Sequence, residues 1–200
     1  IVFGDWSSDV CSSDLFDAGW IDAEPRKGKV GGAYCISLPK ARESRILCNF
    51  DGSFSSVTTI AHELGHAYHH EVLKNAGAIH RSYPMTLAET ASIFSETLIF
   101  ESTIREAAPD EKLGVIESFL QDSTQVILDI LSRFIFENEL FRRRTEAEVS
   151  ADELKALMIA AQKETYGDAL DENLLHPYMW AVKGHFYSQD LGYYNFPYAF

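Results

Sequence analysis

The sequence has little positive charge. It contains 17 lysine and arginine residues against 30 aspartate and glutamate residues, which gives a formal net charge of −13 at pH 7. The basic residues are scattered, and the densest group, at 142–144, has glutamates on both sides and is interpreted as the charged end of a helix. Binding to a phosphate backbone needs a basic face, so we expect no nucleic-acid partner.

Long apolar runs and secretion signals are also missing. No stretch approaches the roughly 20 apolar residues that cross a bilayer as a helix, and no basic start followed by an apolar centre opens the chain. Cysteine is scarce, with 3 in 200 residues. Few thiols without a secretion signal are typical of a reduced intracellular protein. We therefore expect a cytoplasmic protein with no membrane partner, and the sequence does not indicate its oligomeric state.

Residues 1–15 lack the hydrophobic periodicity of the rest of the chain. The stretch from Asp5 to Leu15, DWSSDVCSSDL, resembles one translated reading frame of a sequencing adapter. We therefore set residues 1–15 apart as a non-native segment, the alternative being a native polar loop. The remaining residues, 16–200, contain no repeat or low-complexity linker and are expected to form part of one domain.

The chain is globular in composition, with 46% hydrophobic and 12% aromatic residues. Residues 32–37 and 45–50 have strand character, and the turn near 40–43 predicts a hairpin. Apolar residues then recur every three or four positions, which predicts four helices. These begin at Ser55 or Ser56, at Thr86, at Pro109, and at Ser150, where Glu153 completes a capping box; they end near residues 74, 107, 143 and 167. We expect a mainly α fold with a small β-sheet or hairpin before the first long helix.

A metal-binding pattern, HELGH, lies on the first of these helices. His62 and His66 are four residues apart, so both imidazoles lie on one face, one turn apart. Two histidines in this arrangement are typical zinc ligands. Glu63 is rotated by about 100° from His62 and stands beside the metal, where it can take a proton from water. The sequence therefore predicts one zinc ion per chain.

A third protein ligand is needed, and the pattern points to a carboxylate. The position that holds a third histidine in the extended motif is Val72. The next helix offers Glu89, Glu96 and Glu101, of which Glu89 lies where the chain returns towards the first helix. We therefore predict Glu89 as the ligand, Glu96 as a group that orients a ligand histidine, and Glu101 as an exposed charge.

Two further histidines follow the motif directly. His69 and His70 lie too close in sequence to complete the metal site. We expect His69 to contact and orient a ligand, and His70 to be solvated.

These residues resemble a known family of zinc peptidases, the thimet oligopeptidase and oligoendopeptidase F family. The resemblance covers residues 16–200. It rests on HELGHAYH at 62–69, AETASIFSE at 88–96, FDAGWID at 16–22, PRKGK at 25–29 with GGAYC at 31–35, and the tail at 185–198. It implies a helical catalytic domain of the gluzincin type, and it implies that the chain is a fragment, because family members are much longer on the N-terminal side.

The resemblance also assigns roles to residues. It implies that His62, His66 and Glu89 hold zinc and that Glu63 is the general base. It further implies that His185 and tyrosines of the tail stabilise the oxyanion. A tyrosine hydroxyl suits this role because it can donate a hydrogen bond without carrying charge. The spacing from His185 favours Tyr194, with Tyr198 next. The family often has another tyrosine in this tail where Phe196 stands here.

A glycine-rich stretch precedes the predicted hairpin. Gly31, Gly32 and Ala33 are suited to an edge strand on which a peptide can pair through its backbone. The alternative is a tight turn without a binding role.

We therefore predict a zinc-dependent metalloendopeptidase that hydrolyses internal peptide bonds of short oligopeptides. Two alternatives remain open. A zinc- or peptide-binding domain fragment would bind metal without turnover, and a purely structural helical domain would bind no metal.

Overall fold

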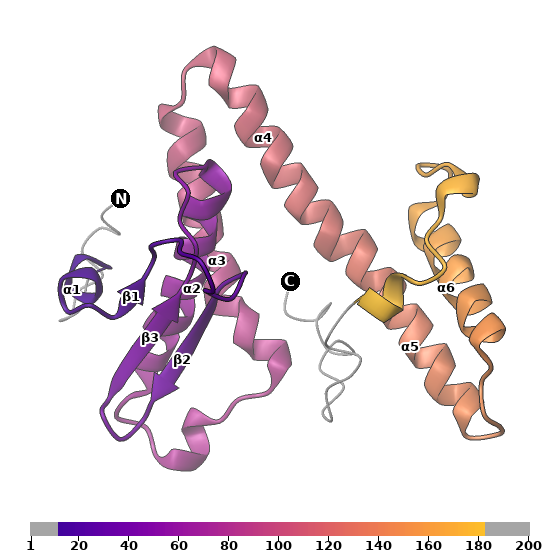
Figure 1. Cartoon of the computed structure of the whole chain (residues 1–200). Helices are drawn as coiled ribbons and strands as arrows, with labels where there is room; N and C mark the ends of the chain where they lie inside the picture. The colour runs from indigo at the N-terminus through magenta and orange to yellow at the C-terminus, as the bar shows by residue number, and fades with distance from the viewer. Residues whose placement is uncertain (1–11, 183–200) are drawn as a thin grey trace. The chain divides into compact units, whose positions relative to one another are not determined.

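The computed structural model describes residues 12–182 (Figure 1). The chain divides into two compact units, which are described here separately. The first unit comprises the residues up to Pro84 together with Ala88–Val115, and the second comprises Met85–Leu87 and the residues from Ile116 onward.

The first unit contains a small three-stranded sheet. Its strands are β1 (Ile21–Asp22), β2 (Tyr34–Leu38) and β3 (Glu43–Leu47), in the order β1-β3-β2. β2 and β3 form the predicted antiparallel hairpin, whereas β1 pairs with β3 in parallel. The second predicted strand ran to Phe50, but the amides of Cys48 and Phe50 donate to the carbonyls of Asp22 and Ala23 and not to β2. The sequence did not predict β1, because a strand of two residues is too short to show an alternating hydrophobic pattern.

The long helix α2 (Phe54–Leu73) carries the HELGH pattern. It begins two or three residues earlier than predicted, because Ser53 and not Ser55 or Ser56 is the capping residue. Ser53 has an extended backbone, and its hydroxyl accepts a hydrogen bond from the amide of Ser56 at 3.1 Å. The three serines are equally good caps by type, so only the backbone geometry distinguishes them.

The core of the first unit lies between the sheet and α2. Ile46 and Cys48 from the β3 region and Ala67 from α2 are buried together with Leu15 of α1 (Ser12–Asp17). Leu15 is the last residue of the segment set apart as non-native. That interpretation of residues 1–15 stays a prediction.

Helix α3 (Met85–Glu106) follows the short turn η1 (Ala78–Arg81) and crosses α2 in close contact. The crossing point is Gly65. A Cβ atom at this position would lie 2.5 Å from the carbonyl oxygen of Ala91 and 2.6 Å from the Cα of Ser92. Only glycine therefore allows the two backbones to approach this closely.

The second unit is helical. It contains the later part of α4 (Pro109–Thr124), the π-helical turn η2 (Gln125–Ile130) and α5 (Leu131–Arg144). These three follow one another without a break, where the sequence predicted one regular helix. α6 (Ala151–Tyr166) begins with the predicted capping box of Ser150 and Glu153. In the core of the second unit, Phe136 of α5 packs against Leu157 and Met158 of α6.

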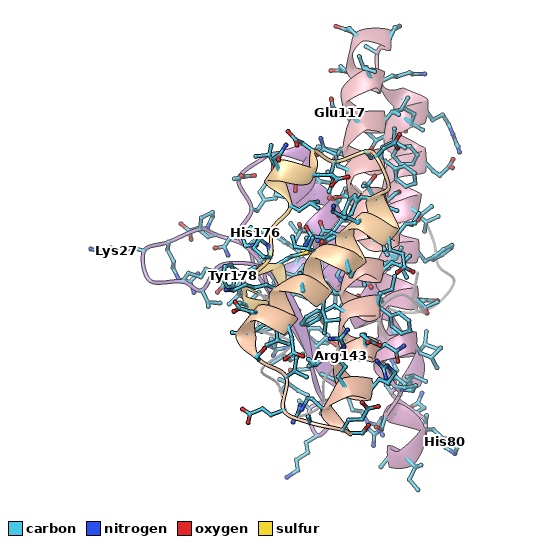
Figure 2. The ribbon with its side chains drawn as sticks, turned by 90° about the vertical axis from the view of Figure 1, so that its right-hand side faces the viewer. Lys27, His80, Glu117, Arg143, His176 and Tyr178 are labelled. Carbon is cyan, nitrogen blue, oxygen red and sulfur yellow. The ribbon has the colours of Figure 1, made fainter. Side chains whose placement is uncertain are left out.

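The chain after α6 returns to that helix through the short turns η3 (Glu172–Leu174) and η4 (Met179–Val182). The buried amide of Gln162 donates to the carbonyl of His176 at 2.9 Å and accepts from its amide at 3.0 Å. His176 and Tyr178 are labelled in Figure 2. The structure is thus mainly α with a small sheet, as predicted, and no helix within 12–182 is both long and apolar enough to cross a bilayer.

Candidate metal centre

Helix α2 brings His62 and His66 together on one face. Their Nε2 atoms are 3.2 Å apart, and the two rings meet edge to face with centroids 4.8 Å apart. This arrangement follows from the four-residue spacing on a helix. Both side chains are half-buried.

Glu89 of α3 completes a group of three. Its Oε2 atom lies 3.1 Å from Nε2 of His62 and 3.4 Å from Nε2 of His66. Within the described part of the chain, these are the three residues whose possible ligand atoms lie within 4.8 Å of one another. The geometry therefore brings together the three residues that the sequence selected.

The distances suit a tetrahedral zinc ion. Ligand atoms about 2.0–2.1 Å from zinc in tetrahedral directions are about 3.3 Å from each other. The three separations between His62, His66 and Glu89 run from 3.1 to 3.4 Å. Two imidazoles and one carboxylate are also a ligand set of catalytic zinc sites, in which the fourth position is left for water. The residues present therefore fit zinc.

Glu96 contacts the opposite nitrogen of His62. Its Oε1 atom is 2.5 Å from Nδ1 of His62 and can accept a hydrogen bond from a proton on that nitrogen. The other ring nitrogen, Nε2, then faces Glu89. Burial would lower the pKa of His62, but its hydrogen bonds with Glu89 and Glu96 outweigh burial and raise that pKa to about 10. The surroundings of His62 thus favour positive charge.

The carboxylate of Glu89 has a second polar neighbour, Ser92. Burial would raise the pKa of Glu89, but hydrogen bonds with His62, His66 and Ser92 lower it well below its ordinary value. The Ser92 hydroxyl lies 2.8 Å from Oε2 of Glu89. An ionised carboxylate at this position is what metal binding requires.

Glu63 is buried beside the two histidines and not among the ligand atoms. Its side chain is only 5% exposed, and its Oε2 atom has no hydrogen-bond partner among the described residues. Burial raises the pKa of Glu63, against the opposing effect of His62 and His66. A carboxylate with a raised pKa and a free oxygen is suited to exchange protons with water.

The neighbouring histidines behave differently from each other. The ring of His69 stacks on Tyr83 with centroids 4.3 Å apart, and its role in orienting a ligand stays a prediction. His70 was expected to be solvated, but it is half-buried. Its Nδ1 atom lies 3.2 Å from the Ser44 hydroxyl, because α2 packs His70 against the sheet.

The other predicted site residues lie outside this cluster. Gly31 and Gly32 form a bend, with Gly32 at φ +81°, and β2 begins only at Tyr34. The residues Gly31, Gly32 and Ala33 thus precede the edge strand, and their binding role stays a prediction. His185, Tyr194 and Tyr198 lie outside the described residues.

A cavity of about 180 Å³ lies elsewhere in the first unit. Its lining includes Ser44 of the sheet, Leu64 and Tyr68 of α2, and Phe94 of α3. None of the three clustered metal-ligand candidates lines it. The cavity is therefore separate from the candidate metal centre.

Comparison with known protein families identifies the family of this chain. The model of peptidase family M3 matches residues 4–200. The chain belongs to peptidase family M3. This match includes most of the segment 1–15 as well as the helices that carry His62, His66 and Glu89.

Relatives within the M3 family carry oligopeptidase names. The chain is 29% identical to the chromosomal oligoendopeptidase F of Lactococcus lactis subsp. cremoris over 201 residues, which is 99% of this chain and 33% of that protein. It is 28% identical to the group B oligopeptidase PepB of Streptococcus agalactiae serotype III over 187 residues, or 92% of this chain and 30% of that protein. The chain thus spans about a third of the length of these relatives.

A solved M3-type structure has the same fold. PZ peptidase A with inhibitor 2 superimposes with a TM-score of 0.72 at 16% identity, over 94% of this chain and 33% of that chain. At this identity the likeness concerns the fold alone, and it confirms the predicted class. The expected resemblance to the oligoendopeptidase F family is likewise confirmed by the relatives.

Sequence reasoning missed the hydroxyl of Ser92 and the contact at Gly65. The position of Ser92 three residues after Glu89, on the same helix face, is the signal that indicates a contact. The contact of Gly65 with Ser92 has no local signal, because it depends on how α2 and α3 cross.

Proposed function

We propose that this M3-family chain carries the catalytic centre of a zinc-dependent metalloendopeptidase that hydrolyses internal peptide bonds of short oligopeptides. One observation carries the proposal. The Nε2 atoms of His62 and His66 and Oε2 of Glu89 converge within 3.1–3.4 Å, next to the buried and partly unpartnered carboxylate of Glu63. The oligopeptidase names of the relatives support peptides as substrates.

In this proposal His62, His66 and Glu89 hold the metal. Zinc, when bound there, supplies a Lewis acid that polarises the scissile carbonyl and makes water a stronger acid. Glu63 takes a proton from the attacking water and later passes it to the leaving amine. Burial raises the pKa of Glu63 towards neutral pH, and a carboxylate with such a pKa can both accept a proton and return it.

Glu96 serves this chemistry indirectly. By accepting from Nδ1 of His62 at 2.5 Å, it holds the imidazole with Nε2 towards the other ligands. His185, Tyr194 and Tyr198 are proposed to donate hydrogen bonds to the oxyanion that forms at the carbonyl. The resemblance of the tail to the family supports their role.

The sheet suggests how a peptide is held. β2 lies at one end of the order β1-β3-β2, so its outer edge pairs with no strand among the described residues. An extended peptide can add to such an edge through backbone hydrogen bonds, with little dependence on its side chains. Gly31, Gly32 and Ala33 lead into this strand and would extend the same binding surface.

A Glu63→Gln variant tests the proposal. The amide cannot accept the proton but leaves the three ligands in place, so we expect unchanged zinc binding and loss of peptide cleavage by at least about 100-fold. Zinc content and cleavage of a quenched fluorescent peptide would be measured side by side. Glu101→Gln, an exposed position on α3, is the matched control and should change neither quantity.

The outcomes separate the alternatives. Zinc binding without cleavage in the unmodified chain favours a binding domain without turnover. Absence of zinc binding contradicts both the zinc-binding domain without turnover and the peptidase proposal. Turnover retained in Glu63→Gln removes Glu63 as the base.

A further inference from the structure

The hydroxyl of Ser92 lies at the crossing of α2 and α3. Its side chain is completely buried, with 0% exposure, so solvent does not satisfy it. Two oxygens of Glu89 lie within reach: the backbone carbonyl at 2.9 Å and the carboxylate Oε2 at 2.8 Å. A hydroxyl has a single proton, so it donates to one of the two at a time.

The carboxylate is the stronger acceptor. Hydrogen bonds to an ionised oxygen are roughly twice as strong as those to a neutral one. Within a helix the Glu89 carbonyl also accepts from the amide four residues later, so it does not need the hydroxyl. The hydroxyl of Ser92 therefore donates its hydrogen bond to Oε2 of Glu89, the atom that faces both histidines.

Ser92 is itself held in place by the other helix. The Cα of Ser92 would lie 2.6 Å from a Cβ at Gly65, so its backbone rests directly on α2. Gly65 stands between Glu63 and His66 in the sequence of α2. The position of Ser92 relative to the histidines is thus set by backbone contact and not by a flexible side chain.

We infer that Ser92 is a positioning residue that holds the Glu89 carboxylate in the orientation required for metal binding. The inference rests on the proposed function, because it takes Glu89 as a ligand. Without the hydroxyl, the Glu89 side chain gains rotational freedom and must be ordered when metal binds. The effect appears as weaker metal affinity, while the fold and the ligand set stay the same.

The chain offers a close control in Ser95. This residue lies one turn further along α3, is also buried, and also approaches Gly65, with its hydroxyl 2.8 Å from the hypothetical Cβ. Its hydroxyl donates to the carbonyl of Ala91 at 2.9 Å and to no carboxylate. Ser95→Ala therefore removes the same atom from the same helix crossing without touching Glu89.

The test measures zinc affinity of the chain by competition with a chromophoric chelator. We expect Ser92→Ala to weaken binding about tenfold or more, in the range found when a group that orients a metal ligand is removed. Ser95→Ala should stay within about twofold of the unmodified chain. Circular dichroism and the unfolding midpoint of the metal-free proteins check that both variants fold.

A double-mutant cycle with Glu89→Ala makes the test specific. If Ser92 acts through Glu89, Ser92→Ala causes no further loss of zinc affinity once Glu89 is alanine. Equal effects of Ser92→Ala and Ser95→Ala, or an undiminished effect of Ser92→Ala in the Glu89→Ala background, would overturn the inference. Failure of the proposed function is recognised separately, as no zinc binding by the unmodified chain or no loss of affinity on Glu89→Ala.

Discussion

Two carboxylates of α3 serve one histidine from opposite sides. Glu89 faces Nε2 of His62 at 3.1 Å, whereas Glu96 contacts Nδ1 at 2.5 Å. Being seven residues apart, they lie two turns apart on one face of the helix. The sequence predicted this division of roles from position along the helix; both carboxylates contact His62, and the roles themselves stay predictions.

At the residue scale, Glu89→Ala and Glu96→Ala should affect zinc affinity unequally. We expect a loss of about 10–100-fold for Glu96→Ala, which leaves all three proposed ligands in place, and a larger loss for Glu89→Ala. Chelator competition measures both, with Glu101→Ala as an exposed control on the same helix. Equal losses, or the reverse order, would show that the ligand has been assigned to the wrong glutamate.

At the scale of elements, the site depends on one crossing of two helices. His62 and His66 belong to α2 and Glu89 to α3, so their distances depend on how closely these helices approach. Gly65 sets that approach, since a Cβ there would overlap two backbone atoms of α3. Backbone atoms cannot rotate away as a side chain can, so a larger residue must separate the helices.

Gly65→Ala should therefore destabilise the chain and weaken zinc binding together. Overpacking of this kind costs about 1–3 kcal/mol of unfolding free energy. Gly114→Ala is the matched control, because Gly114 lies within α4 with nothing within 4 Å of its Cβ position. We expect that control to gain about 0.5–1 kcal/mol from helix propensity. Chemical denaturation and chelator competition measure the two effects, and a stable Gly65→Ala variant with normal affinity would contradict the crossing argument.

At the scale of the whole molecule, each of the two units has a buried core. The second unit also buries an ionisable side chain, the carboxyl group of Glu137. Glu137 of α5 is 1% exposed, and neither carboxylate oxygen has a hydrogen-bond partner among the described residues. Burial raises the pKa of Glu137 from 4.5 to about 7. The folded chain therefore binds a proton at this position more readily than the unfolded chain does.

The stability contribution of Glu137 should fall as pH rises. Below pH about 4.5 the carboxyl is protonated in both states and costs nothing, and the destabilisation grows up to pH about 7. A shift of this size corresponds to about 3 kcal/mol of unfolding free energy at most. We expect Glu137→Gln to be more stable than the unmodified chain at pH 8, and the difference to shrink towards pH 4.5. Urea denaturation across this range measures it, and parallel pH profiles would contradict the prediction.

The sequence by itself determined the features that depend on neighbours along the chain. The four-residue spacing places His62 and His66 on one helix face, and the pair Ser150 and Glu153 caps α6, because both patterns act within one helical turn. The family and the fold class also followed from such local motifs.

Only the tertiary structure decided which groups from different elements touch. The contact of His70 with Ser44 and the pairing of the short strand β1 with β3 had no signal of their own in the sequence. The proposed role of the hydrogen bond from Ser92 to Glu89 also depends on tertiary structure. In the proposed role it orients Glu89, and this depends on the close approach of α3 to α2 at Gly65, because the separation of two helices is a property of packing and not of any local pattern.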